Sequence, residues 1–448
     1  MVTQIKTPST KTIPYIREFP LIGSQYAFRH DRLNFLLHVA QQGDVCGFHV
    51  GLVPIILFNK PEHVQSILVE HASDFIRGQR LRKAIAGNGL LIAEGEFHRQ
   101  QRKLMAPLFQ PRYLASYSDT MTQYGERFQQ QWSDGVVIDL HREMINLVVN
   151  ILGKVLFDMD SIETDELVAA IAVTFARSTY VLSSPFAFPL NWPTPHNRRF
   201  HKAKQYIRDL LQRIITERLN STTEHNDLIS LLLRARYEDG SRMSDQQIMA
   251  ECWTLLTAGH ETTAVALIWV WYLLCQHPEV YERVQQEVDS VLEGQSPTYD
   301  DLPRLPYCLQ VFKEAMRLYS PAPAVRREAL RDVEIDGYLL PKDATVLVSP
   351  YTMHRRPEYF PQPEQFDPER FSPEREKDIP RYAYFPFGGG PRVCIGNHFS
   401  MLEGHLLLAT LAQRMTFTLV PGQTIRFDIE NTLTLRPKGK VEVIVKKR

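Results

Sequence analysis

The chain has 448 residues, with 51 Lys and Arg against 51 Asp and Glu, so its formal net charge is zero. This balance excludes the whole-chain basic excess that is typical of nucleic-acid-binding proteins. A composition of 44% apolar and 23% charged residues excludes general disorder. No linker, repeat or low-complexity segment divides the chain. We therefore predict a single large domain over residues 1–448 that begins with roughly 20–30 irregular residues.

The cysteines and the start of the chain bear on its location. Neither a zinc ribbon nor a disulfide framework is indicated, because no CxxC pair occurs. The first residues lack the apolar core of a secretory signal. The longest apolar run, 264–275, is shorter than the ~20 residues that a bilayer requires. We expect a cytoplasmic protein with no membrane span and no nucleic-acid partner.

The first three quarters of the chain predict a short β part followed by helices. Residues 45–58 are rich in β-forming side chains and predict two strands joined at Gly51. The stretch from Pro61 to Leu318 is mainly helical in pattern. A segment rich in proline and aromatic residues, 183–197, predicts a loop within it.

Short strands return after Pro321. The segments VEIDGYLL and ATVLVS predict strands, and a long irregular stretch runs from His354 to Gly390. A helix from Gly396 to Arg414 and a final strand, VEVIV, complete the chain. The predicted fold class is mainly α, with a smaller β-rich part assembled from both ends of the chain.

One predicted helix is long enough to cross a whole domain. Ser244 is expected to cap its start, with Gln247 completing a capping box. Pro278 ends it, since the residue before proline disfavours the helical conformation. The helix would have about 32 residues and a length of about 48 Å. Its middle, Thr257 to Thr263, is a polar patch in an otherwise apolar element.

The segment FPFGGGPRVCIG, residues 385–396, contains the most specific chemistry. Its glycines allow the backbone to approach a bulky planar partner closely. Cys394 lies at a predicted helix start beside Arg392, which favours the thiolate form. A single thiolate of this kind suits an axial ligand of haem iron. On residue chemistry alone, a glycine-rich turn with a buried, inert cysteine remains the alternative.

This segment resembles the haem-binding signature of the cytochromes P450. The matching motif positions are Phe387, Gly388, Gly390, Arg392, Cys394 and Gly396. Other signatures of the family occur in the right order, so the resemblance extends from Pro20 to the C-terminus. It implies the cytochrome P450 fold, haem b as the cofactor, and Cys394 as the thiolate ligand of the iron.

The patch AGHETT, residues 258–263, resembles the oxygen-activation motif of the same family. Ala258 and Gly259 would allow the haem and oxygen to approach the helix. Glu261 and Thr262 resemble the acid–alcohol pair that relays protons. A threonine at this position can interrupt the local hydrogen-bond ladder and admit water. Taken alone, a Glu-Thr-Thr in mid-helix is typical of a hydrated face.

Glu314 and Arg317 stand three residues apart and match the Glu-x-x-Arg motif of the family. Such pairs are usually solvated. The resemblance implies instead a buried network, with Arg370 as its third member, that fixes the loop carrying Cys394.

Haem propionates require cations. The resemblance implies four residues for this role, each of which is otherwise a plausible surface residue. They are Arg392, His98, Arg102 and Arg327, with Arg326 as the alternative to Arg327.

The substrate pocket of the family is apolar. By position it would be lined by Ala258, Thr262, Ala322, Ala324 and Leu433, with a contribution from residues 81–92. Ordinary core packing is the alternative role for each of these residues.

The motifs are most similar to those of soluble bacterial fatty-acid hydroxylases and their eukaryotic relatives. Where such a bacterial hydroxylase anchors the substrate carboxylate with Arg and Tyr, this chain has Val53 and Leu57. A fatty acid would therefore lack its anchor, and a neutral terpenoid or steroid-like substrate is an equal alternative.

The resemblance implies a haem-thiolate monooxygenase that hydroxylates or epoxidises a hydrophobic molecule with O2 and two electrons. The electrons would come from a separate ferredoxin or flavodoxin with its reductase, because the chain ends soon after Cys394. Arg99 and Lys103 would steer an acidic donor. The alternatives are a peroxygenase or isomerase on the same fold, and a haem-binding sensor that needs Cys394 but not Glu261 and Thr262.

Overall fold

The computed structural model describes residues 11–16, 23–79, 82, 88–160, 164–183, 188–221, 225, 227–428 and 434–448. By its internal contacts the chain divides into two compact units. The first comprises Met1–Arg82, Pro323–Glu364 and Ile379–Cys394, and the second Lys83–Ala322, Gln365–Asp378 and Ile395–Arg448. The expectation of a single domain stays a prediction.

The first unit is built on a five-stranded sheet in the order β1-β2-β8-β5-β3. Its strands are β1 (Val45–Val50), β2 (Val53–Phe58), β3 (Phe75–Ile76), β5 (Val325–Ala329) and β8 (Thr345–Val348). β1 and β2 form an antiparallel hairpin around Gly51, whose φ is +61°, as the sequence predicts. Parallel pairing of β2 with β8 joins strands that are far apart in the chain, which confirms a β part assembled from distant segments.

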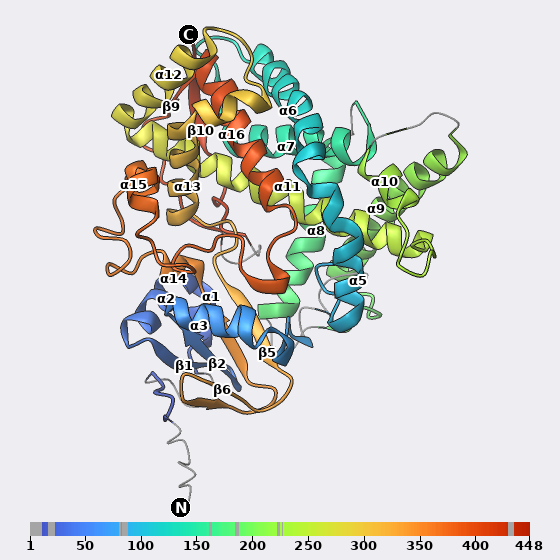
Figure 1. Ribbon diagram of the computed structural model, residues 1–448, viewed down its shortest axis with the longest axis vertical. Coiled ribbons are helices and arrows are strands. Elements are labelled where there is room, and N and C mark those ends of the chain that lie inside the picture. Colours follow the sequence, from blue (N-terminus) through green and yellow to red (C-terminus); the bar gives the residue numbers. More distant parts are fainter. Residues whose placement is uncertain are drawn as a thin grey trace, which may run out of the picture. The chain divides into compact units, whose positions relative to one another are not determined.

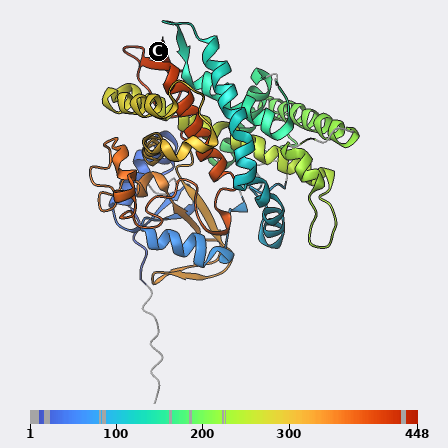
Figure 2. The same cartoon turned by 45° about the horizontal axis from the view of Figure 1, so that its top comes forward.

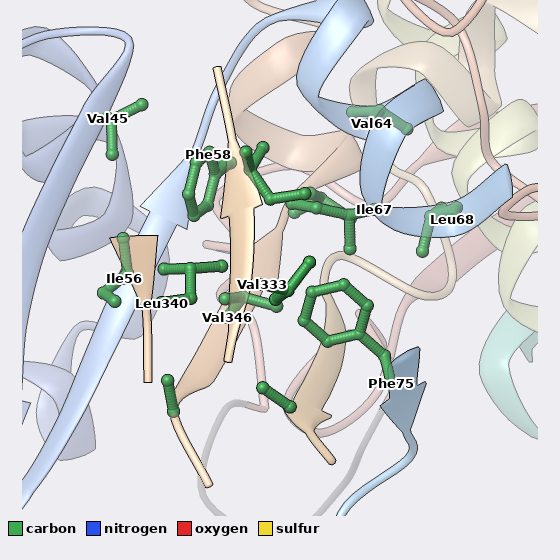
Figure 3. Close-up of a cluster of buried hydrophobic side chains, with 14 of the residues drawn as sticks. Val45, Ile56, Phe58, Val64, Ile67, Leu68, Phe75, Val333, Leu340 and Val346 are labelled. Carbon is green, nitrogen blue, oxygen red and sulfur yellow. The ribbon is translucent and has the colours of Figure 1, made fainter. Parts of the chain in front are cut away.

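Apolar side chains on one face of this sheet form a buried core. Phe58 and Val346 come from the strands, and Ile67 and Leu68 come from a π-helical turn at Ser66–Glu70. Figure 3 shows these side chains pointing toward one another. The remaining elements of the unit are α1 (Gln25–His30), α2 (Arg32–Gln41), α3 (Pro61–Gln65), α14 (Pro350–Met353) and the hairpin of β6 (Val333–Ile335) and β7 (Tyr338–Leu340).

The second unit is mainly helical, as predicted. Its longer helices are α5 (Gly95–Met105), α6 (Pro111–Gln131), α7 (Leu140–Phe157), α8 (Thr164–Ser183), α9 (Pro195–Asn220), α11 (Asp245–Gln276), α12 (Pro278–Leu292), α13 (Pro306–Leu318) and α16 (Asn397–Arg414). Shorter elements are α10 (Leu228–Arg234), α15 (Pro373–Glu376) and a sheet in the order β4-β10-β9, made of β4 (Val137–Asp139), β9 (Met415–Leu419) and β10 (Glu442–Lys447). None of the helices among the described residues is long and apolar enough to cross a bilayer.

Helix α11 has the predicted 32 residues and is buried over most of its length. It packs against α7, α13 and α16. Figures 1 and 2 show α16, in red, lying beside α6, in teal, from two angles. The central helix is therefore enclosed by other helices, so any exposed residue in its middle is conspicuous.

Two local predictions need correction. Ser244 caps α11 by accepting the Gln247 N–H at 3.2 Å, but the Gln247 side chain does not complete a capping box. Its amide donates instead to Glu251 Oε1 at 2.6 Å, since that buried carboxylate lies one turn along the helix. The predicted loop 183–197 is too long, because Ser183 ends α8 and Pro195 begins α9.

Candidate active site

Backbone hydrogen bonds shape the loop that carries Cys394 in the first unit. The Cys394 N–H donates to the Phe387 carbonyl oxygen at 3.0 Å, and the Gly388 N–H donates to that of Phe385 at 2.9 Å. Gly390 has a φ of +64°, and a Cβ at this position would collide with the Leu68 carbonyl oxygen. The loop therefore requires glycine there, because its backbone packs directly on the π-helical turn.

A buried histidine that the sequence did not indicate anchors the start of this loop. His354 has no exposed surface, and its Nε2 accepts the Phe385 N–H at 3.0 Å. The ring stacks on Tyr384 with 5.0 Å between centroids. A single histidine 31 residues before its partner has no local signature, so its role depends on the tertiary fold.

Cys394 differs from the other cysteines. It is exposed, whereas Cys46, Cys252 and Cys308 are buried and Cys275 is partly buried. Burial raises the pKa of Cys275 to about 12 and also raises the pKa values of Cys252 and Cys308. With raised pKa values, these three cysteines remain neutral thiols at physiological pH. They are therefore poor metal ligands, because the thiolate is the form that ligates a metal.

In the second unit, the middle of α11 presents small residues to the outside. Ala258 is exposed and Thr262 is partly exposed, although most residues around them are buried. The two lie one turn apart on the same face. Gly259 faces Leu152 of α7, whose Cδ1 would be 3.1 Å from an added Cβ. Ala258 and Thr262 therefore form an accessible strip in an enclosed helix.

The Thr262 hydroxyl donates to the Ala258 carbonyl oxygen at 2.9 Å. Helix α11 runs without interruption through this point, so the expected break in its hydrogen-bond ladder is not present. The reason is that the hydroxyl adds a bond to the carbonyl one turn earlier rather than replacing the backbone ladder.

Glu261 is held by a residue that the sequence analysis missed. Its side chain is 2% exposed and pairs with Arg436 at 2.9 Å. Arg436 is 20% exposed and also pairs with Asp428 at 2.9 Å. Glu261 is therefore joined to a partly exposed guanidinium. Arg436 lies in the segment TLTLRPKG, residues 432–439, but nothing in this stretch of sequence indicates which helix the arginine contacts.

A second buried carboxyl lies close to the same stretch of α11. The Thr263 hydroxyl contacts the Ser400 hydroxyl at 3.0 Å, and Glu403 is one turn further along α16. Glu403 has no exposed surface. Burial raises the pKa of Glu403 to about 8, so this carboxyl is mainly protonated at neutral pH.

Glu314, Arg317 and Arg370 come together as the resemblance implies. Arg317 Nε lies 2.7 Å from Glu314 Oε2, and neither side chain has any exposure. Arg370 Nε lies 3.4 Å from Glu314 Oε1. The Asp367 N–H donates to the same oxygen at 3.0 Å, so the network joins α13 to the segment around residue 370.

The expected propionate cations occupy different environments. His98 is buried and Arg102 is partly buried on α5. Arg327 is 8% exposed and donates to the Arg326 carbonyl oxygen at 3.0 Å, whereas Arg326 donates to Thr345 Oγ1 at 3.1 Å. Arg392 is partly exposed. The geometry gives no preference between Arg326 and Arg327.

The structure describes some of the residues that are expected to line the substrate pocket. Ala322 is exposed, while Ala324 is partly buried against the cluster that contains Leu57. Leu57 is 1% exposed, so that position of β2 offers core packing and no carboxylate anchor. Leu433, Leu81 and residues 83–87 lie outside the described residues.

The two expected docking cations are both paired. Arg99 Nε lies 2.9 Å from Glu96, and Lys103 pairs with Glu238. All four side chains are more than half exposed. These pairs add little net positive potential, because each charge is offset beside it.

The residues present fit a haem. Cys394 is an exposed sulfur donor, and an added Cβ on Gly388 would meet no atom within 4 Å, so its loop offers an open surface to a flat partner. The exposed strip on α11 likewise has small side chains. A lone cysteine donor, with an acid and an alcohol on a central helix, is the set that a haem-thiolate oxygenase uses.

The comparisons agree with this class. Residues 13–445 match the family model described as Cytochrome P450. Cyclooctatin synthase of Streptomyces melanosporofaciens is 36% identical over 93% of this chain and 92% of that protein. Pentalenene oxygenase of Streptomyces avermitilis is 33% identical over 91% of each chain. The solved cyanobacterial CYP120A1 with bound retinoic acid gives a TM-score of 0.86 at 26% identity, covering 98% of this chain and 100% of that one.

The chain belongs to the cytochrome P450 family and has its fold. It is a haem-thiolate monooxygenase that acts on a hydrophobic molecule, using O2 and a redox partner.

Proposed function

We propose that Cys394 supplies the thiolate that holds the haem iron. The exposure of this sulfur, in a loop that hydrogen bonds and glycine packing hold in place, is the observation that carries the proposal. Bound haem supplies the activation of dioxygen for transfer of one oxygen atom to a C–H or C=C bond. The residues proposed to hold the macrocycle and its propionates are Phe387, Ala258, Gly259, His98, Arg102, Arg327 and Arg392.

Thr262 and Glu261 are proposed to carry protons to the reaction. The Thr262 hydroxyl proton is directed at the Ala258 carbonyl oxygen, so the hydroxyl oxygen can accept from a water. Rotation of the side chain would release that proton in the direction of the exposed strip. Glu261 is the adjacent ionisable group, and Arg436 holds its carboxylate 2.9 Å away. Proton transfer of this kind needs groups within hydrogen-bond reach.

Arg436 is proposed to position Glu261 and to connect it to the surface. Its backbone is fixed, since the neighbouring Leu435 accepts the Trp269 indole N–H at 2.6 Å and donates to Pro321 at 3.0 Å. The guanidinium contacts Glu261 on one side and Asp428 on the other. Protons can therefore pass between solvent and Glu261 when this pair opens.

The proposed substrate is a neutral terpenoid rather than a fatty acid or steroid. Two relatives have names that point to such chemistry, cyclooctatin synthase and pentalenene oxygenase. The buried Leu57 offers no partner for a carboxylate. Titration of the haem-loaded enzyme should give a larger Soret shift at lower concentration with a cyclic terpene than with a fatty acid of similar size. Tighter binding of the fatty acid would contradict this choice.

The electron donor is proposed to be a ferredoxin or flavodoxin with its reductase, and residues 1–448 are proposed to form one P450 domain. A single family model spans 13–445, which supports the domain proposal. A cytoplasmic location is also proposed. Turnover with reductant and a surrogate donor, but not with peroxide alone, would distinguish this enzyme from a peroxygenase.

The haem ligand is tested with Cys394→His. The wild-type protein, reduced under carbon monoxide, should show the Soret band of thiolate-ligated haem, and the variant should show the shorter-wavelength band of imidazole ligation. Cys275→Ser is the control, because that partly buried thiol should leave the band unchanged. A thiolate band that persists in Cys394→His would end the proposal.

A further inference from the structure

One face of α11 carries more than the strip described above. Gln247, Glu251, Thr254, Ala258 and Thr262 follow one another at spacings of three or four residues, so they lie on one face of the helix. Ala258 and Thr262 occupy its exposed part. The three earlier residues contact a different segment of the second unit, residues 88–93.

Two side chains of α11 hold this segment through its backbone. The Leu90 N–H donates to Glu251 Oε2 at 2.8 Å. The Gln247 amide donates to the Asn88 carbonyl oxygen at 3.2 Å and to Glu251 Oε1 at 2.6 Å. Glu251 has no exposed surface. A buried carboxylate that accepts a backbone N–H is costly to remove, because it leaves that donor unsatisfied.

The segment also approaches α11 closely. A Cβ on Gly89 would overlap Thr254 Oγ1 and the Ala250 carbonyl oxygen, so only glycine fits against the helix here. The N–H groups of Ile92 and Ala93 both donate to the Gly89 carbonyl oxygen at 3.0 Å, which folds the segment into a compact turn. Thr254 precedes Ala258 by one helical turn, about 5.4 Å.

The charge state of Glu251 is sensitive near neutral pH. Burial raises the pKa of Glu251 to about 7, while the Leu90 N–H and the Gln247 amide oppose the shift. Among the described residues, no charged side chain of any helix packed on α11 contributes to this pKa. The adjacent Cys252 responds to the Glu251 charge, but burial keeps that thiol neutral.

We propose that Glu251 is a positioning residue that clasps residues 88–93 against α11 and so sets the affinity of the enzyme for its apolar substrate. This inference rests on the proposed function, and on the expectation from the sequence that residues 81–92 contribute to the substrate pocket. The ionised carboxylate accepts both hydrogen bonds at full strength, whereas the protonated group gives up an acceptor site. The clasp therefore tightens as the pH rises through about 7.

The test uses the haem-loaded full chain and two probes that bind haem iron. Imidazole is too small to need the pocket, whereas 4-phenylimidazole carries an apolar ring that must enter it. Glu251→Ala should weaken 4-phenylimidazole about fivefold or more, the scale of one buried hydrogen bond, and leave imidazole unchanged. Hydrogen exchange of the Leu90 amide should accelerate in the same variant. Gln246→Ala, an exposed neighbour, is the control and should change neither.

Glu251→Gln separates positioning from charge. It should retain protection of the Leu90 amide, since its oxygen still accepts, and it should not titrate. The affinity of wild type for 4-phenylimidazole is divided by that of Glu251→Gln at each pH. Protonation of the probe affects both affinities equally, so it does not affect this ratio. This ratio should rise about threefold to fivefold in favour of wild type between pH 6 and pH 8, as expected for gain of a charged acceptor.

The failures of the two proposals are distinguishable. If wild-type protein binds no haem or neither probe, the proposed function fails. If imidazole binds normally and Glu251→Ala alters neither 4-phenylimidazole affinity nor Leu90 exchange, the positioning role of Glu251 is wrong, while the proposed function stands. Should Glu251→Ala load no haem, Gln247→Ala must show the same changes at smaller size, and unchanged values there would also overturn the clasp.

Discussion

Two buried ion-pair networks in the second unit differ in their access to solvent. Glu314 and Arg317 have no exposed side-chain surface, and Arg370 has 5%. Glu261 is equally hidden at 2%, but its partner Arg436 is 20% exposed. A closed network can hold elements together, whereas a network that reaches the surface can also exchange protons.

The hydrogen bonds of each network agree with this distinction. Glu314 is saturated by Arg317 and by the Asp367 N–H, and Arg317 also donates to the Gln365 carbonyl oxygen at 3.0 Å. Glu261 instead pairs with Arg436, which also contacts Asp428. The first arrangement is buried at every member, while the second includes a partly exposed arginine.

The largest effect is expected for Glu314→Ala. The variant leaves Arg317 as an uncompensated buried charge, which costs about 3–5 kcal/mol. We expect little haem-loaded protein, measured as haem absorbance per total protein after purification. Lys313→Ala is the control, because its pair with Glu376 is partly exposed and contributes only about 0–1 kcal/mol. Normal haem content in Glu314→Ala would show that the closed network is not a scaffold.

Glu403 extends the comparison to a carboxyl with no cation paired to it among the described residues. Its folded pKa of about 8 lies above the ordinary value of 4.5, so the unfolded chain releases this proton at lower pH than the folded protein. Stability is therefore lost as the pH rises between these values. Relative to Glu403→Gln, wild type should lose on the order of 2–4 kcal/mol between pH 5 and pH 8.

Thermal melts of both haem-loaded proteins at several pH values measure this difference. The subtraction removes the opposite contribution of His405, whose pKa burial lowers to about 4. A difference in melting temperature that stays constant from pH 5 to pH 8 would mean that Glu403 is ionised in the folded protein.

A smaller effect is expected for Arg436→Ala, which breaks the open network. Turnover should fall about tenfold, equivalent to about 1.4 kcal/mol, because Glu261 loses the group that positions it. Substrate affinity and haem content should stay close to wild type. Arg436→Lys should recover part of the rate, since it restores the charge without the planar fork. Equal turnover in Arg436→Ala would remove Arg436 from the proton route.

The features that sequence reasoning found are those with local signatures. A capping serine before the helix and a proline after it predicted α11, and glycines with a cysteine and an arginine marked the loop of Cys394. The hairpin of β1 and β2 followed from β-forming residues on both sides of Gly51. In each case the pattern and the structure it specifies lie in the same short stretch of chain.

The features that it missed depend on contacts between distant residues. Arg436 meets Glu261 across 175 positions, and Leu90 meets Glu251 across 161. His354 meets a backbone N–H, which no side-chain motif can reveal. The unbroken course of α11 at Thr262 depends on which carbonyl its hydroxyl selects, and the sequence does not specify that choice.

The central claim is that Thr262 and Glu261 deliver protons, and the most direct test is the coupling of reductant to product. Thr262→Ala should keep haem content and substrate binding, yet its product per reductant consumed should fall about threefold or more, with hydrogen peroxide rising to match. Thr262→Ser, which keeps the hydroxyl, should stay close to wild type. Glu261→Gln should slow turnover, because it keeps the shape of the pair and loses the ionisable group. If Thr262→Ala remains tightly coupled, another hydroxyl supplies the proton and the assigned role of Thr262 is wrong.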